Sequence, residues 1–159
     1  MKRLKVGTTY LQRIYTSLKV GKGLGVGIHS SKDTVKVCRE MVNLDTEIMA
    51  IFYLDSLGHV TCYSLIEPGK LDEFEVSSRE IAKNTILSNS RGVILVHNHP
   101  SGDSDPSEKD IQTYKKVRDV LKMIDGITVI DYIIIARDGY SAVVGDEEIT
   151  FAKHTESIG

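Results

Sequence analysis

The chain has 159 residues and lacks the features that mark several large classes of protein. Its two cysteines, Cys38 and Cys62, form no CxxC pair and provide no disulfide framework. No apolar run approaches the length needed to span a membrane, and the N-terminus has no long apolar segment typical of a secretory signal. We therefore expect a cytoplasmic protein without a membrane segment, in which apolar neighbours bury both thiols.

Internal repeats, low-complexity tracts and phosphate-binding motifs are also absent. The glycines near the N-terminus alternate, but their spacing fits neither GxGxxG nor GxxxxGK[ST], so we expect no phosphate-binding loop. A hydrophobic content of 41% and a charged content of 26% are typical of a soluble globular domain. The sequence predicts a basic, glycine-containing N-terminal arm over residues 1–27 and one domain over residues 28–159.

Positive charge is concentrated in the first quarter of the chain. Residues 1–40 contain nine Lys or Arg and two Asp or Glu, whereas residues 41–159 contain eleven and twenty. A basic arm of this kind could contact nucleic acid or an acidic partner. It could equally be a solvated tail that packs on its own acidic domain, and we favour this second interpretation. Nucleic-acid binding is therefore possible but has no other support in the sequence.

Hydrophobic periodicity predicts alternating strands and helices. Apolar runs predict strands at residues 48–54, 60–66, 92–96, 129–136, 140–144 and 148–152. Helices are predicted to begin at the serine caps Ser30, Ser77 and Ser107. The second of these helices should bury Ile86 and end near Gly92. Because the strand at 92–96 is apolar throughout, it should be buried on both faces, which predicts a three-layer α/β/α sandwich around a mixed sheet.

One segment carries the residues of a metal site, namely His97-Asn98-His99-Pro100 followed by Ser107 and Asp110. Side chains alternate along a strand, so His97 and His99 point the same way and Asn98 points to the opposite face. Asp110 falls in the first turn of the helix and can face the end of the strand. Two imidazoles and a carboxylate would leave a fourth tetrahedral position on a zinc ion for water, as in catalytic sites. This arrangement predicts metal-assisted hydrolysis.

Other interpretations of these residues remain open. Ser107 and Asp110 also fit a helix capping box, which would explain both without a metal. A nuclease could use the same ligands, although an imidazole-rich set suits zinc better than magnesium. A zinc deaminase is disfavoured because no PCxxC follows the histidines. The remaining histidines lie in turns or near the C-terminus, and we expect them at the surface: His29, His59 and His154.

The motif resembles that of a known family. Glu47, with His97-Asn98-His99-Pro100, Ser107 and Asp110, resembles the motif of the JAMM (JAB/MPN) zinc metallopeptidases. The longer string HNHPSGDSDPSEKD is similar to the RadC-like branch, and the resemblance covers roughly residues 28–152. It implies the JAB/MPN form of the α/β/α sandwich, which is cytidine-deaminase-like. One departure is Tyr132, because the family typically has a histidine there.

The resemblance also implies roles for the residues. His97, His99 and Asp110 would hold Zn²⁺, Glu47 would shuttle a proton between water and the leaving amine, and Ser107 would hydrogen-bond the oxyanion. The substrate would be a peptide or isopeptide bond, often beside a ubiquitin-like tail. A non-catalytic or DNA-associated module is the alternative, which we rank lower because all ligands are present. Specificity is predicted to lie in the loops at 67–75 and 101–106, and the oligomeric state stays open.

Overall fold

The computed structural model describes residues 26–66, 77–145, 148–156 and 158. Most of the predicted basic arm and the predicted specificity loop at 67–75 lie outside the described residues. Within the described ranges, no helix is long and apolar enough to cross a membrane.

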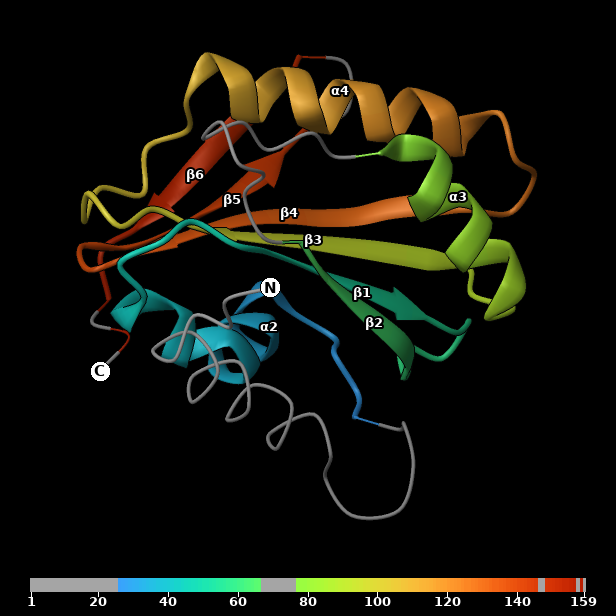
Figure 1. The fold of residues 1–159 in the computed structure, drawn as a ribbon, viewed down its shortest axis with the longest axis horizontal. Coiled ribbons are helices and arrows are strands. Elements are labelled where there is room, and N and C mark those ends of the chain that lie inside the picture. Colours follow the sequence, from blue (N-terminus) through green and yellow to red (C-terminus); the bar gives the residue numbers. More distant parts are fainter. Residues whose placement is uncertain (1–25, 67–76, 146–147, 157, 159) are drawn as a thin grey trace, which may run out of the picture.

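A six-stranded mixed sheet forms the centre of the described chain (Figure 1). Its strands lie in the order β2-β1-β3-β4-β5-β6. The central pair β3 and β4 is parallel, and every other neighbouring pair is antiparallel. The strand bounds are β1 Met49–Leu54, β2 Val60–Ile66, β3 Gly92–Asn98, β4 Thr128–Ala136, β5 Gly139–Val144 and β6 Thr150–His154.

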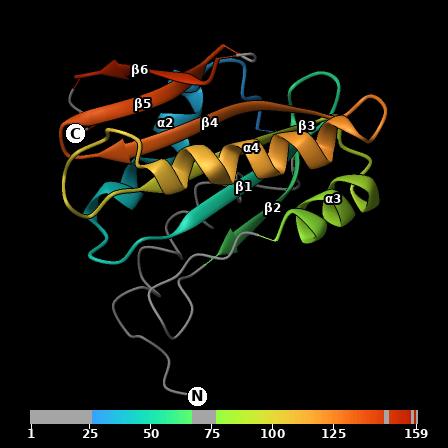
Figure 2. The same ribbon diagram turned by 90° about the horizontal axis from the view of Figure 1, so that it is seen from above.

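Helices cover both faces of this sheet. Helices α3 (Ser78–Leu87) and α4 (Glu108–Lys122) lie on one face, and α2 (Ser31–Cys38) lies on the other (Figures 1 and 2). A 3₁₀ turn, η1 (Arg39–Asn43), continues α2. The predicted three-layer α/β/α sandwich with a mixed sheet is therefore confirmed. The predicted serine caps are also confirmed, because the side chains of Ser30, Ser77 and Ser107 each accept a hydrogen bond from the third following backbone N–H.

The sheet separates two hydrophobic cores. Along β3, Ile94 and Val96 belong to the core beneath α2, whereas Val93 and Leu95 belong to the core beneath α3 and α4. Every residue of β3 is buried, as the apolar run predicted. The alternation continues to the end of the strand, so His97 lies on the α4 face and Asn98 on the α2 face.

Helix α3 ends earlier than the sequence predicted. Its last residue is Leu87 rather than a residue near Gly92, because Asn89 adopts a left-handed conformation with φ of 52°. Asn89 N–H donates to the Ile86 carbonyl at 3.0 Å, and the next N–H reaches back to Thr85, which closes the helix in a Schellman arrangement. Ile86 falls in this terminal turn and is 59% exposed, so its predicted burial is wrong.

The C-terminal strand also differs from the prediction. Strand β6 ends at His154, two residues beyond the predicted end at Ala152. His154 is half-buried because its ring stacks on Tyr140, with centroids 4.6 Å apart and an interplanar angle of 14°. The expected surface position of His154 therefore holds only in part. The two thiols differ in burial. Cys38 is buried as predicted, whereas Cys62 is only partly buried, so the prediction for Cys62 holds only in part.

The conformation of Asn89 leads to a stability prediction. Glycine tolerates left-handed backbone because it has no Cβ, and asparagine because its short polar side chain can hydrogen-bond locally, whereas alanine has the Cβ without such a bond. Asn89→Ala should lower the free energy of unfolding by about 1 kcal/mol, and Asn89→Gly should leave it nearly unchanged. Urea denaturation of both variants measures this difference. Equal losses in the two variants would mean that the asparagine side chain, rather than the backbone, closes the helix.

Candidate metal centre

The end of β3 positions the two histidines. His97 lies in register with Met49 of β1 on one side and Ile134 of β4 on the other. Immediately after the strand, His99 N–H donates to the Ile135 carbonyl at 2.9 Å. The backbone is therefore held from both sides, and strand alternation brings the two rings together, with centroids 4.9 Å apart and planes at 90°.

The first turn of α4 positions Asp110. Ser107 caps the helix, and its Oγ accepts from Asp110 N–H at 3.2 Å. In return, Asp110 Oδ2 accepts from Ser107 N–H at 2.8 Å and from Ser107 Oγ at 2.6 Å. The predicted capping box is therefore present. It fixes the buried Asp110 carboxylate at the helix N-terminus, pointing at the end of β3.

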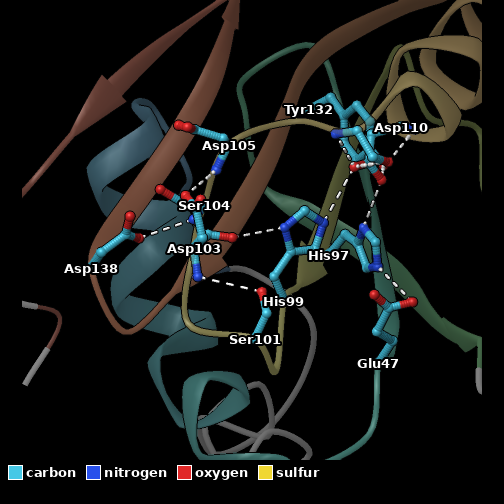
Figure 3. Close-up of polar contacts among 11 residues, drawn as sticks. Glu47, His97, His99, Ser101, Asp103, Ser104, Asp105, Asp110, Tyr132 and Asp138 are labelled. Atoms are coloured by element: carbon cyan, nitrogen blue, oxygen red, sulfur yellow. Dashed lines mark hydrogen bonds and ion pairs between the residues drawn. The ribbon is translucent and has the colours of Figure 1, made fainter.

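Asp110 contacts both histidines (Figure 3). His97 Nδ1 lies 3.0 Å from Asp110 Oδ1, and His99 Nε2 lies 3.2 Å from Asp110 Oδ2. Tyr132 Oη on β4 also donates to Asp110 Oδ1, at 3.2 Å. The structure thus brings together the three residues that the sequence singled out as a ligand set, and it adds Tyr132, which the sequence marked only as a departure from the family.

Glu47 lies on the more open side of this cluster. It precedes β1 by two residues, and its side chain is 44% exposed. Its Oε2 is 3.7 Å from His97 Nε2. One ligand atom from each of Glu47, His97 and His99 lies within 4.8 Å of the other two. A half-exposed carboxylate therefore stands directly beside a buried imidazole.

Asn98 holds the backbone on both sides of Glu47 from the opposite face of the sheet. Asn98 is 1% exposed, its Oδ1 accepts from Ile48 N–H at 2.7 Å, and its Nδ2 donates to the Thr46 carbonyl at 3.1 Å. No sequence motif identified a role for Asn98. The signal was present, because a polar side chain directed into a core must find hydrogen-bond partners there.

The carboxylates and imidazoles of the cluster each stabilise the charged form of the other. Burial alone would raise the pKa of Asp110, but hydrogen bonds from His97, His99 and Ser107 hold that pKa well below its usual range. Burial would lower the pKa of each histidine, but the Asp110 carboxylate raises both above the usual value. Contact with His97 lowers the pKa of Glu47. Glu47 and Asp110 are therefore ionised at neutral pH.

A cavity of about 330 Å³ opens over these residues. The loop after β3 forms part of its wall, and the Asp103 carbonyl lies 2.9 Å from His99 Nδ1, which orients that ring. Lys153 of β6 holds the loop in turn, with Nζ 2.9 Å from Asp103 and 2.8 Å from Asp105. Sequence reasoning missed Lys153, and no local pattern identifies it. The remaining wall residues include Met49, Ser101, Lys109, Thr113 and Tyr132.

The donor set fits a metal ion. Ligands bound at 2.0–2.1 Å to a tetrahedral zinc lie roughly 3.3 Å from one another. Asp110 approaches the two imidazoles to 3.0 and 3.2 Å through different oxygens, and one ligand atom from each of Glu47, His97 and His99 lies within 4.8 Å of the other two. Imidazole with carboxylate suits zinc and several other divalent transition metals. The cluster around His97 and His99 could therefore hold a divalent cation.

The chain is similar to proteins of a known family. Residues 28–148 match the family model of the RadC-like JAB domain. The chain belongs to this family. Among similar UPF0758 proteins, that of Thermotoga maritima is 34% identical over 71% of this chain and 50% of its own length. That of Desulfitobacterium hafniense is 39% identical with the same coverage, and that of Syntrophomonas wolfei is 31% identical over 90% of this chain and 57% of its own length. This RadC-like JAB domain thus spans about half the length of the curated relatives it matches.

The ion-paired cluster predicts the pH dependence of the metal-free RadC-like JAB domain. The lowered pKa of Asp110 adds stability above its unfolded pKa of about 3.9, which is lost as the pH falls. The raised pKa values of His97 and His99 add stability below their unfolded value of about 6.5, which is lost as the pH rises through the folded pKa values. The melting temperature of chelator-treated protein should therefore be highest between about pH 4 and 6.5 and fall towards pH 9.

The matched control for this prediction is Asp110→Asn, which keeps the shape of the side chain and removes its charge. Its melting temperature should fall much less between pH 6 and 9 than that of the wild-type protein. An equally steep fall in both proteins would show that other groups dominate the pH dependence.

Proposed function

We propose that this RadC-like JAB domain is a zinc-dependent hydrolase that cleaves a peptide or isopeptide bond. One observation carries the proposal: the half-exposed Glu47 carboxylate stands 3.7 Å from His97, beside the buried cluster and in the same cavity. A metal-dependent hydrolase needs a base next to its metal ligands, and the position of Glu47 supports that role. The free thiols Cys38 and Cys62 are consistent with a reducing cytoplasm.

We assign the metal ligands as His97, His99 and Asp110. Bound there, zinc would polarise the substrate carbonyl and lower the pKa of an attacking water towards ~7. The capping box, the Tyr132 hydroxyl and the Asp103 carbonyl hold these ligands in place. Such support keeps the ligand side chains oriented towards one point.

Glu47 is the proposed general base. Its lowered pKa keeps the carboxylate ionised at neutral pH, so it can take a proton from the attacking water. The same carboxyl group then carries this proton to the leaving amine. Because Asn98 bonds the peptide groups at Thr46 and Ile48, the backbone that carries Glu47 is fixed relative to the histidines.

Ser107 is the proposed oxyanion donor, and its hydrogen bonds allow this role alongside helix capping. Its hydroxyl now donates to Asp110 Oδ2. Its backbone N–H donates to the same oxygen, so that oxygen keeps a partner when the hydroxyl turns towards a substrate. A hydroxyl beside the ligands can then stabilise the developing negative charge.

The proposed substrate is a protein or peptide, with a ubiquitin-like tail as one form. A cavity of about 330 Å³ has room for the groups around one scissile bond but not for a folded partner. The remainder of the substrate must therefore lie on the outer surface of the domain, where it would determine specificity.

Substitution of Glu47 tests this proposal. Purified wild-type protein should bind one zinc per chain, and Glu47→Gln should retain it, because Glu47 is not an assigned ligand. Hydrolysis should fall at least about 100-fold in Glu47→Gln, since the general base is lost. The readout is the release of new amines from a mixture of ubiquitin-tailed isopeptides and proteome-derived peptides, measured by amine labelling and mass spectrometry.

Glu108→Gln provides the matched control, because Glu108 is an exposed carboxylate in the first turn of α4. It should retain both zinc and activity. Wild-type rates in Glu47→Gln would contradict the proposed base. Zinc-loaded wild-type protein that releases no amine from any substrate in the mixture would contradict a peptidase function.

A further inference from the structure

We propose that Tyr132 is a positioning residue of the metal centre, whose hydroxyl fixes the Asp110 carboxylate in its metal-binding orientation and thereby raises metal affinity. The proposal rests on the assignment of Asp110 as a ligand. It concerns β4, a strand that contributes none of the ligands proposed above.

Hydrogen bonds hold both oxygens of the Asp110 carboxylate (Figure 3). Tyr132 Oη donates to Oδ1 at 3.2 Å, and Ser107 donates to Oδ2 through both its N–H and its hydroxyl. Each carboxylate oxygen therefore has a donor other than the histidines. With both oxygens held, the carboxylate is not free to turn about its Cβ–Cγ bond, and the oxygen facing each imidazole is fixed.

The ring of Tyr132 is itself held in place. It is fully buried and stacks on Tyr114, with centroids 6.1 Å apart and planes at 11°. Phe151 of β6 packs edge-on against it at 5.9 Å and 70°. Tyr114 lies one helical turn beyond Asp110 on α4, so the same helix contacts the ring of Tyr132 through Tyr114 and its hydroxyl through Asp110.

These contacts have a consequence for metal binding. A carboxylate that is already oriented loses little conformational freedom when it binds an ion, so the affinity is higher than for a freely rotating side chain. Partners that orient metal ligands typically contribute 10- to 100-fold to affinity. Removing the Tyr132 hydroxyl should therefore weaken metal binding while leaving every proposed ligand in place.

The test is a double-mutant cycle on zinc affinity. Dissociation constants are measured by competition with a chromophoric chelator for wild type, Tyr132→Phe, Asp110→Ala and the double variant. Tyr132→Phe should weaken zinc binding about tenfold. In the Asp110→Ala background the same change should have no further effect, because the carboxylate that the hydroxyl orients is gone.

Controls separate orientation from packing. Phenylalanine keeps the ring that Tyr114 and Phe151 contact, and melting temperatures of the metal-free variants verify that each is folded. Tyr140→Phe removes the hydroxyl of another buried tyrosine, on β5 and on the opposite face of the sheet, and should leave zinc affinity unchanged.

Three outcomes would be decisive. Wild-type zinc affinity in Tyr132→Phe would overturn the inference. Equal weakening of zinc binding with and without the Asp110 carboxylate would also overturn it, because it would indicate a general packing effect. Wild-type affinity in Asp110→Ala would instead contradict the ligand assignment of the proposed function, so the two failures are distinguishable.

Discussion

Strand β3 carries the candidate site because it stays regular through its last residue, Asn98. The period of two along a strand directs His97 and His99 to one face and Asn98 to the other. A shift of one residue would exchange these faces and bury the imidazoles beneath α2. Neighbours on both sides prevent such a shift, since β1 and β4 pair with β3 along its length. The irregularity in the pairing with β4 falls between Val93 and Ile94, before the histidines.

The two faces of β3 therefore serve different parts of the proposed chemistry. On the α4 face, the imidazoles meet the capped carboxylate of Asp110 in one cavity. On the α2 face, the buried amide of Asn98 fixes the peptide groups around Glu47. The segment from His97 to His99 thus contributes both to the place where a metal would bind and to the position of Glu47, the proposed base. Because the two sets of contacts lie on opposite faces, a change in one can leave the other intact.

Much of the fold could be predicted because its signals are local. The serine caps and the alternation of His97 and His99 each depend on residues that are close in sequence, and the structure agrees with all of them. The end of α3 was missed because Gly92 offers the stronger helix-stop signal, although asparagine is the other residue that commonly turns left-handed at a helix end. The role of Lys153 was missed because it holds a loop 50 residues earlier in the chain. The contact between Tyr132 and Asp110 spans 22 residues and two different elements, so no periodicity encodes it.

The sequence by itself determined which chemical groups could form a metal site and which way each one points within its strand or helix. Strand alternation and helix capping act over a few residues, so they can be recognised in the sequence. Only the tertiary structure decided which groups meet. Three contacts depend on how the helices and strands pack. They are the approach of Glu47 to His97, the sharing of Asp110 between two imidazoles and Tyr132, and the hydrogen bonds of Asn98 to the backbone around Glu47. Packing is set by the contacts of both cores together, and therefore by residues far apart in the chain.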